Sequence, residues 1–276
     1  MATIIVHGTM TIWKAHHYTW WWNSFHPGGF CGAVAEGMRA AGRRPDVWAV
    51  GEVQVAQVPA LARNPRKANM ITHQGHYEWT GTDMDATRLA GGKFLAYYLN
   101  AIRRVASREP IDVIAHSHGG NVVKVATMAR HLDPAVHLRN VVFLACPHWV
   151  THLHDGPHYP YRLNPQRVTR VLNLYSEEDT IQYRLAAAVP GGWSHRLVAN
   201  LPSPGRIDAD PRIRGRYENY HVATKVGAKT AHSVMHGPIV GRLIGVWLAA
   251  NGEESFRNIA AHLKPPVPIR DSSDGS

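Results

Sequence analysis

A serine flanked by two histidines stands at the end of a short apolar run, in the segment from Ile111 to Gly120. A serine hydroxyl is a weak nucleophile until a base takes its proton, and it must stay exposed while its neighbours are packed. A sharp turn from a strand into a helix meets that need, and its sequence pattern is G-x-S-x-G. Here the pattern reads Ala115-His116-Ser117-His118-Gly119, with alanine in place of the first glycine. The segment predicts that Ser117 is a nucleophile; the alternative is an ordinary strand-to-helix connection capped by this serine.

An acyl-transfer serine also needs hydrogen-bond donors for the oxyanion that develops on its substrate. The backbone N–H of His118 follows the serine directly, and we expect it to be one donor. A second donor is expected in the loop after the first strand, "IIVHGTM", where Gly8 permits a tight turn. We favour the N–H of Thr9, with Met10 as the next choice and as a substrate contact; a simple turn is the alternative reading. The imidazoles of His116 and His118 are weak candidates for the general base, because the turn itself restrains their geometry.

The acid that orients the base is expected after a later strand. The segment "VLNLYSEEDTIQ" places Glu177, Glu178 and Asp179 just beyond an apolar run. We favour Asp179, because it ends the turn before the chain becomes apolar again, although a solvated acidic turn is also consistent with the pattern. Its role would be to hold the catalytic imidazole in one tautomer.

The base is expected in the loop before the last long helix. The segment "GAKTAHSVMHGPIVG" offers His232 and His236, and Pro238 marks the start of the helix. His232 lies within the loop and is favoured over His236, which lies at the helix cap; the choice between them stays open. The resulting chain order of Ser117, Asp179 and His232 differs from the orders of trypsin-like and subtilisin-like enzymes.

Short β-rich runs alternate with helical periodicity, which predicts an α/β fold with a mostly parallel sheet of about six strands flanked by helices. A single domain is expected over residues 1–262, with a disordered tail over 263–276. Irregular segments at 10–30, 51–82, 147–167 and 183–219 are expected to be binding loops. Strands are expected at 3–6, 46–50, 111–115, 141–145, 168–175 and 221–226, and helices at 32–42, 85–107, 119–132 and from Pro238.

The chain resembles the α/β-hydrolase family, in particular its bacterial esterases and lipases. The matching segments are "VHGT" at 6–9, "AHSHGGN" at 115–121, "ACPH" at 145–148, "YSEEDTI" at 175–181 and "AHSVMHGP" at 231–238. The resemblance implies the α/β-hydrolase fold without its first two strands and with long loops in place of a full cap domain. It also implies that an ester is hydrolysed through an acyl-serine, and such a triad needs no metal or other cofactor.

The composition of the chain limits where the protein is expected to act and which partners it is expected to bind. The 276 residues are 45% hydrophobic and carry a formal charge of +10, with no apolar run as long as a membrane span. No signal peptide is visible, so a cytoplasmic location is the default expectation. The positive charge favours anionic partners, but there is no basic run of five residues, and nucleic acid is not expected. A phospholipase acting on anionic membranes, delivered as a toxin, is the alternative function, and a catalytically silent binding protein is a third. The oligomeric state stays open.

The cysteines, a histidine-rich segment and the tryptophans are the remaining residues that could serve chemistry or binding. Cys31 and Cys146 do not form a disulfide framework, and we expect both to be buried and reduced. The spacing of the histidines between 152 and 158 matches no zinc signature, so no metal site is predicted. Trp149 ends a strand at the same edge as the serine and is a candidate substrate contact. The tryptophans at 20–22 would either pack a loop onto the sheet or line an acyl pocket.

Overall fold

A single twisted sheet forms the centre of the computed structural model, which describes residues 2–6, 29–45, 47–49, 85–146, 163–176, 179, 217–222, 234–263 and 269–271. Within these residues the sheet has seven strands in the order β2-β1-β3-β4-β5-β6-β7. The first six are parallel to their neighbours, and only β7 is antiparallel. The strands are β1 (Ala2–Val6), β2 (Val47–Ala49), β3 (Ile111–His116), β4 (Leu138–Leu144), β5 (Val168–Tyr175), β6 (Tyr217–Val222) and β7 (Ile269–Asp271).

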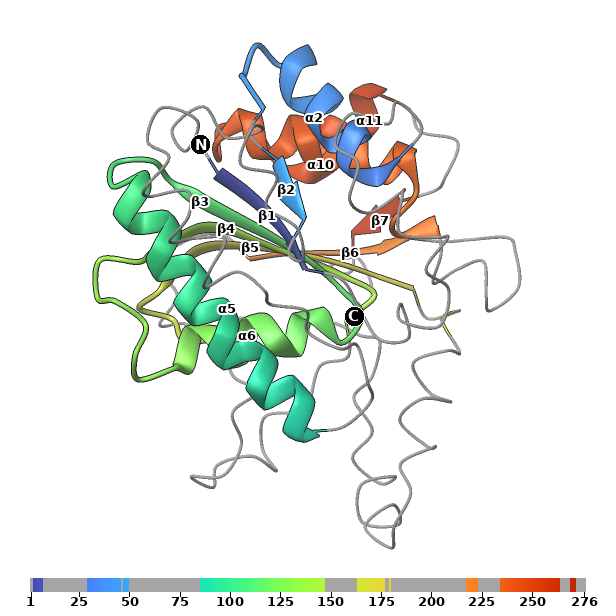
Figure 1. Cartoon of the computed structure of the whole chain (residues 1–276). Coiled ribbons are helices and arrows are strands. Elements are labelled where there is room, and N and C mark those ends of the chain that lie inside the picture. The colour runs from blue at the N-terminus through green and yellow to red at the C-terminus, as the bar shows by residue number, and fades with distance from the viewer. Residues whose placement is uncertain are drawn as a thin grey trace, which may run out of the picture.

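Helices cover both faces of the sheet (Figure 1). One face carries α5 (Asp85–Val105) and α6 (Gly119–Met128), and the other carries α2 (Phe30–Ala40), α10 (Pro238–Ala250) and α11 (Phe256–Leu263). Successive strand residues therefore enter opposite cores: Val141 and Phe143 pack with α5 and α6, whereas Val142 and Leu144 pack with α2 and α10. Burial on both faces explains why these strands read as unbroken apolar runs. The predicted α/β class, with a mostly parallel sheet flanked by helices, is confirmed.

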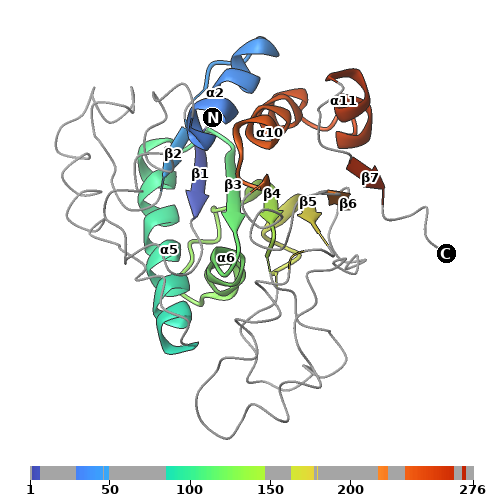
Figure 2. The same ribbon diagram turned by 90° about the vertical axis from the view of Figure 1, so that its right-hand side faces the viewer.

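The order of the strands reverses at β1, which lies between β2 and β3 (Figure 2). The chain passes from β1 to β2 on one side and then returns to place β3 on the other side. In open parallel sheets such a reversal leaves a crevice beyond the carboxyl ends of the strands, where ligands bind. Ser117 follows the last residue of β3, so the candidate nucleophile lies at this position.

The carboxy-terminal part of the chain differs from the prediction. Residues Ile269–Asp271 do not continue a disordered tail but pair with β6, with Val222 opposite Ile269 and Tyr220 opposite Asp271. The adjoining α11 was not predicted, and β6 begins at Tyr217 rather than at His221. Three residues carry too little periodicity to signal a strand, and the pairing depends on the free edge that β6 offers. Residues 264–268 and 272–276, like almost all of the four predicted loops, lie outside the described residues.

A row of buried polar side chains crosses the sheet near the amino ends of β3 to β6, away from Ser117. Asp112, Asn140, Arg170 and Glu218 have relative exposures of 0%, 0%, 6% and 6%. Asp112 accepts hydrogen bonds from Asn140 Nδ2 at 2.8 Å and from Arg139 Nε at 3.0 Å. These contacts join neighbouring strands in register.

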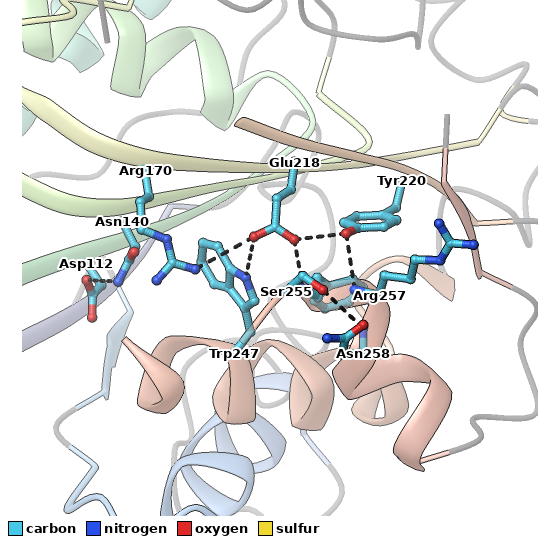
Figure 3. A network of polar contacts seen from close by, with 10 residues as sticks. Asp112, Asn140, Arg170, Glu218, Tyr220, Trp247, Ser255, Arg257 and Asn258 are labelled. Atoms are coloured by element: carbon cyan, nitrogen blue, oxygen red, sulfur yellow. Dashed lines mark hydrogen bonds and ion pairs between the residues drawn. The ribbon is translucent and has the colours of Figure 1, made fainter. Parts of the chain in front are cut away.

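Glu218 joins this row to the helices of the same face (Figure 3). Its Oε1 accepts a hydrogen bond from Trp247 Nε1 at 3.1 Å and lies 3.8 Å from Arg170 Nη2. Its Oε2 accepts from the Tyr220 hydroxyl at 2.9 Å and from the backbone N–H of Phe256 at 2.7 Å. The Arg170 guanidinium also lies 4.2 Å from the centre of the Trp247 ring. One carboxylate therefore ties β5, α10 and the first turn of α11 together.

Replacing Glu218 by alanine is expected to lower the free energy of unfolding by about 3–5 kcal/mol, because it removes one member of a buried ion pair together with its hydrogen bonds. Equilibrium unfolding in urea measures the change. The control is Glu253→Ala at an exposed carboxylate, which is expected to change stability by no more than about 0.5 kcal/mol. Equal unfolding midpoints for the two variants would show that the network does not stabilise the fold.

Candidate active site

The backbone of Ser117 adopts the left-handed conformation, with φ at +52°. The residue lies between β3 and α6 and is only 3% exposed, so in the structure it is less open to solvent than the sequence pattern leads one to expect of a nucleophile. Its N–H donates to the carbonyl of Leu144 at 2.9 Å, and its own carbonyl accepts from the N–H of Gly120 at 3.0 Å. A residue with a side chain reaches this conformation at a cost of about 1–2 kcal/mol. The strand, turn and helix predicted around Ser117 are all present, and the turn holds the serine in the strained conformation that a nucleophile elbow requires.

The first turn of α6 begins directly after the serine. His118 is the N-cap residue, and its carbonyl accepts the N–H groups of Asn121 at 3.0 Å and Val122 at 3.3 Å. The amino end of a helix favours negative charge, because its backbone N–H groups and its dipole point toward that end. An anion forming next to Ser117 would therefore meet a favourable field.

The turn at residues 116–120, called the elbow below, packs tightly against the end of β4 and the residues that follow it. A Cβ added to Gly120 would lie 2.6 Å from Cys146 Sγ and 3.1 Å from Phe143 Cδ1. Both contacts are closer than van der Waals packing allows without movement. Only glycine at this position lets α6 approach the end of β4 as closely as it does, and this approach fixes the turn that carries Ser117.

Gly120→Ala is therefore expected to push the elbow away from β4. We expect a loss of about 1–3 kcal/mol in the free energy of unfolding, which thermal unfolding measures. Adding Cys146→Gly removes both Cys146 atoms that the new Cβ would meet, Sγ at 2.6 Å and Cβ at 2.9 Å. In the Cys146→Gly background the loss caused by Gly120→Ala should therefore be smaller, and an equal loss would contradict the steric explanation.

Burial changes the pKa of two side chains near the elbow, Cys146 and Lys124. Burial raises the pKa of the Cys146 thiol to about 12, so this cysteine stays protonated at neutral pH and is not a competing nucleophile. Burial lowers the pKa of Lys124 to about 8, and its ammonium lies 5.6 Å from the centre of the Phe143 ring. Cys31 is also buried, and neither cysteine is in a disulfide, as expected.

Asp179 lies beyond the carboxyl end of β5 and is completely buried. Its N–H donates to the carbonyl of Ser176 at 3.1 Å, which closes a turn directly after the strand. Because β3, β4 and β5 are parallel neighbours, this turn and Ser117 lie at the same edge of the sheet. A buried carboxylate at this edge is suited to a polar partner rather than to solvent. Glu177 and Glu178 lie outside the described residues.

The loop before α10 reaches the elbow. The ring of His236 contacts the ring of His116 edge to face, with 4.5 Å between the ring centres and an interplanar angle of 89°. His116 precedes Ser117 and is 5% exposed. Of the two candidate bases, His236 therefore lies against the residue that precedes the serine. His232 itself, together with Thr9, Met10 and Trp149, lies outside the described residues.

Sequence reasoning missed Arg88, which is 5% exposed and lies beside the elbow. Its Nη1 lies 3.5 Å from Nδ1 of His118. A signal was present, because Arg88 stands on the same helical stripe as Gly92, Leu95 and Leu99, where apolar residues are expected. A charged residue such as Arg88 on the apolar face of a helix is expected to have a polar partner in the interior.

The described ranges show neither a membrane-spanning helix nor a metal site. No helix in these ranges combines the length and the hydrophobicity needed to cross a bilayer. The same ranges contain no group of three His, Cys, Asp or Glu side chains placed to hold a metal ion. The histidines between 152 and 158 fall outside the described residues.

Comparison with known proteins adds little. No family model matches the chain, and no curated protein matches it. Among solved structures, the chain is similar to a presumed hydrolase of the alpha/beta superfamily from Xanthomonas campestris pv. campestris, with 12% identity and a TM-score of 0.34. The match covers 90% of this chain and 96% of that chain. The α/β-hydrolase-like fold rests instead on the parallel sheet, its reversal at β1 and the strained serine after β3.

Proposed function

We propose that the protein is a serine hydrolase that cleaves carboxylic esters through an acyl-serine intermediate. The observation that carries this proposal is the left-handed conformation of Ser117 at the reversal of the strand order, where β3 ends and α6 begins. Ala145, directly after β4, has the same conformation with φ at +47°, so the conformation alone does not identify a nucleophile. The support comes from a serine in this conformation at the amino end of α6, which is the arrangement of a nucleophile elbow.

The proposed triad is Ser117, His232 and Asp179. The buried position of Asp179 at the edge that carries Ser117 supports its role as the acid. The contact of His236 with His116 supports a base from the loop before α10, in which His232 lies four residues upstream. The N–H groups of His118 and Thr9 are proposed to bind the oxyanion, with Met10 and Trp149 contacting the substrate.

The reaction would proceed in two stages. His232 takes the proton of the Ser117 hydroxyl as the serine oxygen attacks the ester carbonyl, and the resulting oxyanion is held by the two N–H groups. The tetrahedral intermediate collapses as the imidazolium returns its proton to the departing alkoxide, which leaves the acyl-serine. Water then attacks the acyl carbon with the same base, and the acid product and free Ser117 are released.

Asp179→Asn is expected to lower kcat by up to roughly ten-thousand-fold, because the amide would stabilise the wrong imidazole tautomer and could not stabilise the imidazolium. Turnover of a short p-nitrophenyl ester measures the effect. Glu177→Gln and Glu178→Gln are the matched controls and should retain activity. If Glu178→Gln alone shows the large loss, the acid is Glu178.

Covalent labelling tests the proposal itself. A fluorophosphonate probe should react with the wild-type protein, and mass spectrometry should place the adduct on the peptide that contains Ser117. Prior heat denaturation should abolish labelling, because the reaction depends on the folded site. A folded protein that takes up no probe and turns over no ester in a panel of acyl-chain lengths would revive the alternative of a non-catalytic binding protein.

A phospholipase acting on anionic membranes is the second candidate. Two observations favour it: the formal charge of +10 and the exposed aromatic side chains of Phe94 and Tyr97, 51% and 47% exposed on one face of α5. Exposed aromatic groups beside basic ones suit a lipid interface. Hydrolysis of phospholipid should then rise on vesicles that contain anionic lipid, relative to neutral vesicles. Equal rates on both, with faster turnover of water-soluble esters, would exclude this function.

A further inference from the structure

The imidazole of His118 is contacted at one nitrogen by two other side chains. Nδ1 lies 3.2 Å from Asn121 Nδ2 and 3.5 Å from Arg88 Nη1. The three side chains are 6%, 0% and 5% exposed, so water does not readily replace either contact. They come from two helices, since Arg88 belongs to α5 and Asn121 to the first turn of α6.

The chemistry of arginine decides the protonation of the ring. A guanidinium has donors only and keeps its charge in proteins. Nδ1 of His118 must therefore act as an acceptor, and the proton of the neutral ring must reside on Nε2. The same reasoning orients the amide of Asn121 with its NH₂ group toward the ring, because its oxygen would otherwise face the lone pair of Nδ1.

The contact with Arg88 opposes a second proton on the ring. An added proton on Nδ1 would point at the guanidinium of Arg88, which has donors only, and would place a new positive charge beside it. The Asn121 amide could turn its oxygen toward such a proton, so the opposition comes from Arg88. Like charges at this separation repel, and burial increases the cost because solvent screens the pair poorly. Two other titratable side chains near the turn have contacts of their own. The ring of His116 contacts His236, and the ammonium of Lys124 lies over the ring of Phe143.

We infer that Arg88 is a positioning residue of the elbow, which holds His118 as a neutral imidazole protonated at Nε2. The inference rests on the proposed function, in which the backbone N–H of His118 binds the oxyanion. A ring locked between α5 and α6 fixes the peptide that donates this hydrogen bond. If the His118 ring keeps one charge state, its contribution to the electrostatic field at the oxyanion stays constant. This holds while the proposed base, His232, gains and loses its proton.

The ring state is measured without catalysis. ¹⁵N-histidine NMR of the wild-type protein between pH 5 and 8 should show His118 with an unprotonated Nδ1 and a protonated Nε2 throughout, and without titration. A His118→Gln variant identifies its signals among the 19 histidines. A proton on Nδ1, or a ring that titrates in this range, would overturn the inference.

Kinetics then test the link to the site. In Arg88→Met the cation is lost, and His118 should begin to titrate, so that the pH profile of kcat/KM gains a second ionisation on its acid side. Arg88→Lys retains a charged donor and should restore a single ionisation, whereas the control Arg104→Met, at an exposed arginine of the same helix, should match the wild type. A profile for Arg88→Met with the wild-type shape would overturn the role of Arg88.

The failures of the two proposals are distinguishable. A protein in which fluorophosphonate does not label Ser117 contradicts the proposed hydrolase, whatever the state of the His118 ring. A protein that is labelled at Ser117 but whose His118 titrates normally contradicts only the role of Arg88. If Arg88→Met does not fold, the wild-type NMR titration alone decides the ring state.

Discussion

Ser117→Ala is expected to abolish ester hydrolysis, with kcat falling by a factor on the order of 10⁶, as for serine hydrolases in which the nucleophile is removed. The variant should still fold, because alanine adopts the conformation of Ser117 at a similar cost and the hydrogen bonds of Ser117 with Leu144 and Gly120 join backbone atoms. Turnover of a p-nitrophenyl ester and a circular dichroism spectrum measure the two properties. Unchanged turnover in a folded variant would disprove the mechanism.

Ser117→Gly separates the strain from the chemistry. Glycine reaches positive φ without steric cost, so this variant should be more stable than Ser117→Ala by about 1 kcal/mol while being equally inactive. Ser107→Ala, at an exposed serine near the end of α5, is the matched control and should retain full activity. If glycine gives no gain in stability over alanine, the conformation of Ser117 is not strained.

His232→Ala should be as damaging as the loss of the serine, with a fall in kcat on the order of 10⁶, because removing either the nucleophile or its base disables the same step. The double variant with Ser117→Ala should be no worse than either single variant, since the two residues act as a unit. Steady-state turnover measures all three. Additive losses would mean that the two residues act independently.

His236→Ala is the discriminating comparison. In the structure this ring packs against His116, and its loss should reduce kcat by less than about 10-fold, in keeping with a lost edge contact. His262→Ala, at an exposed histidine of α11, controls for general effects of removing an imidazole. If His236→Ala shows the million-fold loss and His232→Ala does not, the base is His236.

The sequence predicts local features of the site well and contacts between distant elements poorly. The elbow around Ser117 was predictable because strand, small residues and helix follow one another within a few positions, and the position of Asp179 follows from an apolar run that ends just before it. The contact of Arg88 with His118 depends on how α5 packs against α6, which no local pattern encodes. The ring contact between His116 and His236 likewise needs the whole sheet to bring the loop before α10 to β3. Strand β7 escaped prediction because its partner, rather than its own three residues, determines it.

The two strands at the edges of the sheet are short, which affects the tendency of the protein to aggregate. In the part of the chain that the structure describes, the sheet ends on β2 and β7, and each of them is three residues long. A long, flat outer strand offers unpaired N–H and carbonyl groups on which a second chain can add its own strand, and this pairing starts aggregation. Short strands at both ends offer little template, and the antiparallel β7 occupies the side of β6 that would otherwise be open. This short strand therefore covers the edge of β6, with Tyr220 opposite Asp271 and Val222 opposite Ile269, so that the longer β6 is not the strand that meets another copy of the chain.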